Sequence, residues 1–224
     1  KYGPLSPRQE KTLKRAAKNI KKTREMVNGL LEIGRSEAGA CLCCRFQLSR
    51  TVHEVVLDGL ETALGAIFDE SKEDRKENEL YQFFSTNGVF IDISPRMTNI
   101  EMLQDETKFR QIFLNLVTNA LFYRKKRVEI KMRMKNDQLL LEITDDGPGI
   151  KPEHHDTIFK QYTQIQGAPS ELQRKGHGLG LAGALILSRC LGGNIKIKSD
   201  KEKGATFCLT LPIRLESSAR LLTA

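Results

Sequence analysis

The stretch "DDGPGI", residues 145–150, ends an alternating segment with a carboxylate followed by two glycines. A buried Asp145 at a strand end can accept a hydrogen bond from an exocyclic amine, and the glycines let the backbone approach a flat ring. Farther along, "GHGLGL" (176–181) opens a predicted helix, where backbone N–H groups and the helix dipole favour phosphate. Each motif alone is weak, and the second fits the dinucleotide pattern G-x-G-x-x-G poorly.

A pair of asparagines in "FLNLVTNALFY", residues 113–123, is the next unusual feature. Asn115 and Asn119 are four residues apart, so both point to the same side of a helix. Asparagine is unfavourable inside a helix because its amide competes for backbone hydrogen bonds. Two amides on one face, flanked by Phe, Leu and Val, therefore need an explanation.

The segment 151–175 between the two glycine motifs is too long for an ordinary loop in a compact domain. We expect a lid, with Arg174 and Lys175 as candidate phosphate contacts; the alternative is that both are solvated basic residues. A third glycine motif, "GATF" (204–207), precedes an apolar strand.

The elements that must position these motifs follow from periodicity and turn residues. In chain order we expect a long helix (5–39), a second helix (49–68), a charged connector or frayed helix end (69–79), the strands "VFIDIS" and "NIEML", a helix (106–123), a hairpin of 127–135 and "QLLLEITD" turning at Asn136-Asp137, a helix (179–191) and the strand "TFCLTLP".

The first helix has a start signal and an unpartnered apolar stripe. Ser6 can cap it, with Gln9 at the capping-box position. Apolar residues from Leu13 to Leu31 form a narrow seam, like that of a coiled coil or bundle. We expect this seam to pack on a missing helix or a second chain, although a solvated linker helix would suit its basic middle.

Composition narrows the class of protein. The 224 residues carry a net charge of +8, with no membrane-length apolar run and no signal peptide. We therefore expect a cytoplasmic protein. Because the sequence opens with Lys1 and not Met, we expect a fragment or a processed product, whose parent chain could still be membrane-anchored. No nucleic-acid module is evident. The five cysteines favour reduced thiols; "CLCC" (41–44) with His53 could hold a soft metal, but a short strand is favoured.

Taken together, the order and spacing of the motifs resemble the ATP-binding domain of histidine kinases, in the superfamily shared with DNA gyrase, heat-shock chaperone and mismatch-repair ATPases. The asparagines match its N-box, "IFKQY" its phenylalanine motif, and 145–150, 176–181 and 204–206 its three glycine boxes. The resemblance implies an α/β two-layer sandwich, a mixed β-sheet with helices on one face, preceded by a long helix. The implied parts are a dimerisation-module helix (1–40), the ATP-binding domain (41–216) and a tail (217–224).

The resemblance also assigns roles. Asn119 would hold Mg²⁺ and Asn115 would support the same site; an amide oxygen suits this ion and adds no negative charge near phosphates. Asp145 would accept a hydrogen bond from the adenine amino group, with the Thr206 hydroxyl near the same edge. The remaining residues expected around ATP are Tyr123, Gly147, Gly149, Ile150, Lys175, Gly176, His177, Gly178, Leu179, Gly180 and Leu181.

Two departures from the family pattern stand out. Histidine kinases often carry Lys or Arg three residues after the magnesium asparagine, where this chain has Phe122; Tyr123, Arg124 or Lys125 could substitute. The phosphoacceptor motif, a His followed by an acid and an Arg-x-Pro run, is absent, and His53 belongs to the ATP-binding domain's own first helix. The chain is therefore expected to bind the phosphate donor without carrying the acceptor.

The residue at the general-base position favours transfer over hydrolysis. Gyrase-like ATPases have Glu four residues before the magnesium asparagine, whereas this chain has Asn115, and an amide cannot take a proton from water. We expect the catalytic part of a two-component sensor histidine kinase that donates the γ-phosphate to a histidine elsewhere, dimerises through residues 6–37 and serves a response regulator. The alternatives are a non-catalytic nucleotide-binding scaffold and an anti-sigma-type serine kinase.

Overall fold

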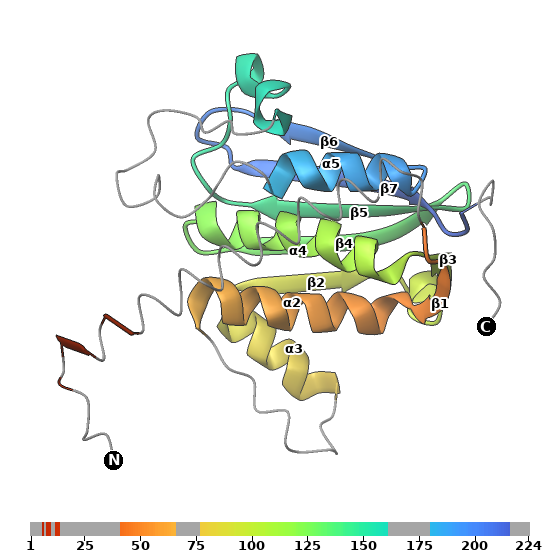
Figure 1. The fold of residues 1–224 in the computed structure, drawn as a ribbon, viewed down its shortest axis with the longest axis horizontal. Helices are drawn as coiled ribbons and strands as arrows, with labels where there is room; N and C mark the ends of the chain where they lie inside the picture. Colours follow the sequence, from red (N-terminus) through yellow and green to blue (C-terminus); the bar gives the residue numbers. More distant parts are fainter. Residues whose placement is uncertain are drawn as a thin grey trace.

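A five-stranded mixed sheet forms the centre of the computed structural model, which describes residues 41–65, 77–160 and 180–215 together with Ser6, Arg8, Gln9, Thr12 and Leu13. The strand order is β2-β4-β5-β7-β6 (Figure 1). Only β2 and β4 pair in parallel; the other neighbours are antiparallel. The strands are β2 (Val89–Ile93), β4 (Val128–Lys135), β5 (Gln138–Asp145), β6 (Asn194–Ser199) and β7 (Ala205–Pro212).

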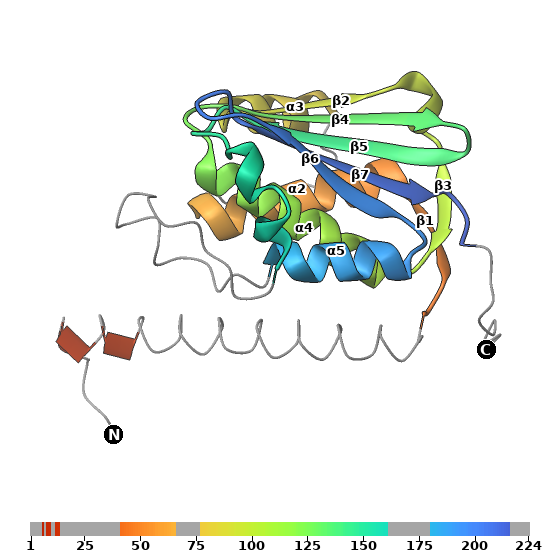
Figure 2. The same cartoon turned by 90° about the horizontal axis from the view of Figure 1, so that it is seen from above.

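Three helices cover one face of this sheet (Figure 2). They are α2 (Leu48–Leu64), α4 (Glu106–Tyr123) and α5 (Gly180–Cys190), with α4 packed against both neighbours. Alternation along β5 explains the two layers, because Leu139, Leu141 and Ile143 are buried while the residues between them are half-buried. The predicted two-layer sandwich with helices on one face is confirmed.

Smaller elements close the ends of the sandwich. Helix α3 (Glu77–Thr86) lies against β2, and β1 (Cys44–Gln47) pairs with β3 (Glu101–Gln104) in a separate two-stranded sheet. Residues 213–215 run beside β3, where the Leu103 N–H donates to the Ile213 carbonyl at 3.0 Å. Short 3₁₀ turns occur at Pro95–Met97, Pro152–His154 and Thr157–Phe159.

Most predicted elements are present with small shifts at their ends. Helix α4 has the predicted bounds, and Asn136 and Asp137 form the hairpin turn with φ of 50° and 57°. Helix α2 ends four residues earlier than predicted, because Gly65 adopts a left-handed conformation and its N–H closes on the Glu61 carbonyl. Helix α3 and strand β6 were not predicted.

The N-terminal capping box is confirmed. The Gln9 N–H donates to Ser6 Oγ at 3.3 Å, and the Ser6 N–H donates to Gln9 Oε1 at 2.9 Å. The rest of the predicted helix 5–39, including its apolar seam, and the predicted tail 217–224 lie outside the described residues. None of the described helices is long and apolar enough to cross a membrane.

Candidate functional site

Asp145, the last residue of β5, is a buried carboxylate with its side chain only partly occupied by hydrogen bonds. It is 4% exposed, and the Gly147 N–H donates to its Oδ1 at 2.8 Å. Burial raises the pKa of Asp145, although hydrogen bonds from the backbone N–H groups of Gly147 and Ala205 oppose the rise. A carboxylate has about four lone-pair positions, so Asp145 retains the capacity to accept a hydrogen bond from a ligand amine.

The glycines after Asp145 let the loop lie directly on neighbouring backbone. A Cβ on Gly147 would come within 2.5 Å of the Tyr123 carbonyl oxygen at the end of α4. Gly149 has φ of +70°, and a Cβ there would lie 1.9 Å from the Asp200 carbonyl oxygen in the β6–β7 turn. Glycine is therefore required at both positions, and the loop is held between α4 and the β6–β7 turn.

The asparagine pair lies on the flank of α4 that faces α5. Both side chains are half-buried, and the Gln111 side chain donates to Asn115 Oδ1 at 3.3 Å. A Cβ on Gly180, the first residue of α5, would lie 3.7 Å from the same oxygen. No hydrogen bond joins the Asn119 side chain to another described residue. The last glycine of the second glycine box thus meets Asn115, and the Asn119 amide remains available as an oxygen ligand.

The position of Thr206 follows from the pairing of β5 with β7. In the β5–β7 register Asp145 lies opposite Ala205, and Thr206 lies opposite Thr144. The Thr144 and Thr206 hydroxyls are 2.9 Å apart and hydrogen-bonded to each other. Because side chains alternate between the two faces of a sheet, Thr206 points to the face away from Asp145. The register therefore does not support the expectation that the Thr206 hydroxyl lies near the same edge of adenine as Asp145, because Ala205 lies opposite Asp145.

Tyr123, Arg124 and Lys125 are the three residues expected to substitute for the Lys or Arg that histidine kinases often carry at position 122. The Arg124 guanidinium donates to the carbonyl oxygens of Asn87 at 2.8 Å and Gly88 at 3.3 Å, so it binds the turn between α3 and β2. The rings of Phe122 and Tyr123 pack edge to face with centroids 5.0 Å apart, and Tyr123 is 39% exposed. Of the three candidates, Arg124 is held away by structural contacts, while Tyr123 and Lys125 remain at the surface.

The 3₁₀ turn Thr157–Phe159, which holds the first two residues of the phenylalanine motif, packs against α5. Ile158 is buried, and the Phe159 ring lies 6.5 Å from the Phe207 ring in an edge-to-face contact. Just before the predicted lid, the Ile150 N–H donates to Ser199 Oγ at 2.8 Å. Residues 161–179 lie outside the described part of the chain, including the predicted site residues Arg174, Lys175, Gly176, His177, Gly178 and Leu179. Leu181, in the first turn of α5, is half-buried against the core.

Two alternatives from the sequence receive no support. His53 lies within α2, where its Nε2 is 3.2 Å from the Tyr81 hydroxyl of α3 and the rings pack edge to face. Among the described residues, which include Cys41, Cys43 and Cys44, no group of three His, Cys, Asp or Glu side chains is arranged to hold a metal.

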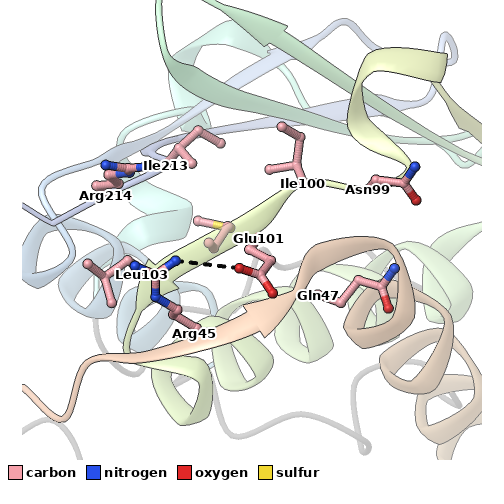
Figure 3. A pocket seen from close by; sticks show the side chains of 9 residues that line it. Arg45, Gln47, Asn99, Ile100, Glu101, Leu103, Ile213 and Arg214 are labelled. Carbon is pink, nitrogen blue, oxygen red and sulfur yellow. Dashed lines mark ion pairs between the residues drawn. The ribbon is translucent and has the colours of Figure 1, made fainter.

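A groove of about 550 Å³ lies between β1, β3 and residues 213–214 (Figure 3). Arg45 and Glu101 form an ion pair of 3.6 Å across it. Its lining contains none of the predicted site residues. The groove lies near the start of β5, whereas Asp145 is at the end of that strand.

The model of the histidine kinase-, DNA gyrase B- and HSP90-like ATPase family matches residues 104–215, half of the chain. The chain belongs to this family. The match spans the N-box helix, the loop after β5, the helix α5 and the strand β7, which are the elements that carry the site.

Named relatives agree with this placement. The histidine-protein kinase ArlS of Staphylococcus aureus strain USA300 is 40% identical over 111 residues, which are 49% of this chain and 24% of ArlS. The chain thus matches about a quarter of the length of the curated relatives. Full-length ShkA, solved in complex with AMPPNP, covers 94% of this chain over 40% of its own, with a TM-score of 0.64 and 21% identity. The histidine kinase AdeS of Acinetobacter baumannii covers 96% of this chain and 88% of its own, with a TM-score of 0.64 and 19% identity. At these identities the structures support the fold.

Proposed function

We propose that this ATPase-family chain binds ATP with Mg²⁺ and donates the γ-phosphate to a histidine that is not one of its own four. Three family motifs come together and support this proposal. Asp145 is buried, the Gly147 backbone lies against the end of the N-box helix, and Asn115 lies against Gly180. This arrangement offers an acceptor for an amine, backbone for a flat ring, and amides near a helix N-terminus for phosphates.

Each residue then has a role. Asp145 accepts a hydrogen bond from the adenine amino group, and the loop with Gly147, Gly149 and Ile150 borders the ring. Asn119 supplies an oxygen ligand to Mg²⁺, an ion that prefers oxygen and neutralises triphosphate charge. Asn115 supports the same region as a neutral amide. From the second glycine box and the lid we propose Lys175, Gly176, His177, Gly178, Leu179, Gly180 and Leu181 as neighbours of the phosphates.

Transfer is favoured over hydrolysis because the site has no carboxylate at position 115. Attack by water needs a base near the γ-phosphate, and Asn115 cannot accept a proton. Attack by an imidazole nitrogen needs positioning and charge neutralisation instead. In that step a nitrogen–phosphorus bond forms, the bond to the bridging oxygen breaks, and ADP leaves.

The partners follow from this chemistry. We propose a phosphoacceptor helix that carries the histidine, a response regulator that receives the phosphate, and a homodimer formed through residues 6–37. The second candidate is a scaffold that binds nucleotide without transfer, and it is favoured by Phe122 at the usual basic position together with the use of Arg124 in the α3–β2 turn.

Calorimetric titration with ADP, with and without Mg²⁺, tests the binding site. Asp145→Asn should weaken binding with or without the ion, because an amide replaces a pure acceptor by a mixed donor and acceptor. Asn119→Ala should weaken only the Mg²⁺-assisted part. Thr206→Val is the matched control, since that side chain lies on the other face of the sheet. Unchanged affinity in both site variants would refute the assignment.

Radiolabelled ATP tests the reaction. The chain should label a separate protein that supplies the phosphoacceptor helices, with an acid-labile and base-stable bond, and should release little free phosphate. Label that appears on the chain itself and disappears in His53→Gln would overturn the assignment of the acceptor. Release of phosphate at an ordinary enzyme rate, about 1 per second or more, would overturn the kinase proposal.

A further inference from the structure

Asp146, the neighbour of the adenine-binding candidate, accepts hydrogen bonds from three successive backbone N–H groups. Its Oδ1 receives the N–H of Lys125 at 2.8 Å, of Lys126 at 3.0 Å and of Arg127 at 3.1 Å. The Asp146 N–H in turn donates to the Arg127 carbonyl at 3.3 Å. Successive N–H groups of this kind form an anion-binding concavity, and here the chain fills it with its own carboxylate.

This contact is charge-assisted and maintained near neutral pH. Partial burial alone would raise the pKa of Asp146, but the hydrogen bonds from Arg127, Lys126 and Lys125 outweigh it and lower the pKa below its ordinary value. Hydrogen bonds to a charged acceptor are roughly twice as strong as neutral ones. The segment 124–127 is therefore fixed to the end of β5.

The segment 124–127 is the continuation of the N-box helix. It follows Tyr123, the last residue of α4, and its first residue, Arg124, is five residues beyond Asn119. On its other side it is braced by the α3–β2 turn, where the Val128 N–H donates to the Gly88 carbonyl at 2.9 Å and the Lys126 carbonyl would lie 2.3 Å from a Gly88 Cβ. The segment 124–127 is thus the joint between the helix and the sheet.

Asp146 stands between the two residues that form the adenine side of the proposed site. Asp145 precedes it, and Gly147, which rests on the Tyr123 carbonyl, follows it. One carboxylate therefore ties the loop that carries the adenine acceptor to the helix that carries the Mg²⁺ ligand.

We propose that Asp146 is a positioning residue that sets the distance between the adenine end and the phosphate end of the nucleotide site. The inference rests on the proposed function. A ligand that spans both ends gains affinity from having them held in register, because a preorganised site pays less ordering free energy when the ligand binds. A ligand that uses the adenine end alone gains nothing from the register.

This difference separates positioning from a general effect on folding. Loss of the Asp146 carboxylate should weaken binding of Mg²⁺·ADP by about tenfold or more, and should change the affinity for adenosine by less than about twofold. A variant that only loosens the fold would weaken both ligands by the same factor. Asp146→Ala removes all acceptors, while Asp146→Asn keeps one oxygen and should give a smaller loss of Mg²⁺·ADP affinity.

The experiment compares Mg²⁺·ADP and adenosine on the same protein by calorimetry and ligand-observed NMR. Asp137→Asn is the matched control: it removes the same charge from the far end of β5, at a turn position with φ of +57° that asparagine accepts. Hydrogen exchange of the amides of residues 125–127 reports release of the joint, and a thermal melt confirms that each variant is folded. If Asp146→Ala does not fold, the affinities for Mg²⁺·ADP and adenosine are compared in Asp146→Asn.

A selective loss of Mg²⁺·ADP affinity with faster exchange at 125–127, and with Asp137→Asn unchanged, supports the inference. Equal losses for both ligands, or no loss in a folded variant with released amides, overturn it while leaving the proposed function intact. A wild-type chain that binds neither ligand overturns the proposed function, and the inference falls with it.

Discussion

Replacing Gly149 by alanine should lower the free energy of unfolding by more than the conformational cost of an alanine at positive φ. The residue has φ of +70°, and an alanine Cβ would lie 1.9 Å from the Asp200 carbonyl oxygen and 3.1 Å from that of Gly204. Both neighbours are backbone atoms, so no side chain can turn away. The loop after β5 or the β6–β7 turn must move.

The magnitude follows from a comparison with Gly65. That glycine has nearly the same φ, +67°, but no described heavy atom lies within 4 Å of its Cβ position. Gly65→Ala therefore carries only the conformational cost, about 1–2 kcal/mol. Gly149→Ala carries the same cost plus that of the clash, about 1–3 kcal/mol. The effect of alanine on the unfolded chain is similar in both variants and cancels in the difference.

Urea unfolding of both variants and the wild type measures this difference in the free energy of unfolding. Gly149→Ala should be less stable than Gly65→Ala by about 1–3 kcal/mol, which corresponds to roughly 2–12 °C in Tm at about 2–4 °C per kcal/mol. Its Mg²⁺·ADP affinity should fall as well, whereas that of Gly65→Ala should not. Equal destabilisation of the two variants would refute the view that the loop is pinned between α4 and the β6–β7 turn.

Three further outcomes are expected. Lys108→Met should lower the free energy of unfolding in urea by about 3–5 kcal/mol, because it leaves the buried Asp105 without the Lys108 ammonium 2.6 Å away. Adding Asp105→Asn should recover part of this loss, and no recovery would contradict the pairing. Thr206→Val should cost no more than about 1.5 kcal/mol and leave nucleotide affinity unchanged by calorimetry. Maleimide should modify the exposed Cys44 first and Cys208 last by peptide mass spectrometry, because burial raises the pKa of Cys208; equal rates in the folded chain would contradict this order.

The sequence predicted an element correctly where a capping or turn residue coincided with a clear period of apolar residues. Helix α4 has its predicted bounds because Asp105 caps it, accepting the Lys108 N–H at 3.1 Å, and apolar residues recur along one side. The β4–β5 hairpin follows from Asn136-Asp137, two residues that accept positive φ. Helix α3 was missed because its charged approach suggests a connector, and only Leu80, Phe83 and Phe84 mark a buried side.

The candidate site was predicted as separate motifs, without the register that brings them together. Family motifs named Asp145, the asparagines and Thr206 as candidates, but a motif does not show which residue of the third glycine box faces Asp145. Only the pairing of β5 with β7 shows that Ala205 faces Asp145. The same limit applies to Arg124 and Asp146, whose partners lie 19 to 37 residues away in the sequence. No local pattern specifies such contacts, because they depend on which elements meet.

Burial of the Asp145 carboxylate, the proposed amine acceptor, lowers the stability of the fold once the group is ionised. Burial raises the pKa of Asp145 above its ordinary value of 3.8, so the folded chain binds a proton more tightly than the unfolded chain does. The free energy of unfolding therefore falls as pH rises through the window between 3.8 and the raised value, and the cost is complete above that window. A ligand amine that donates to the carboxylate favours its ionised form and offsets this cost. Nucleotide that binds as proposed should accordingly stabilise the chain more above the window than below it, because the proposed amine acceptor is also a residue whose burial weakens the fold.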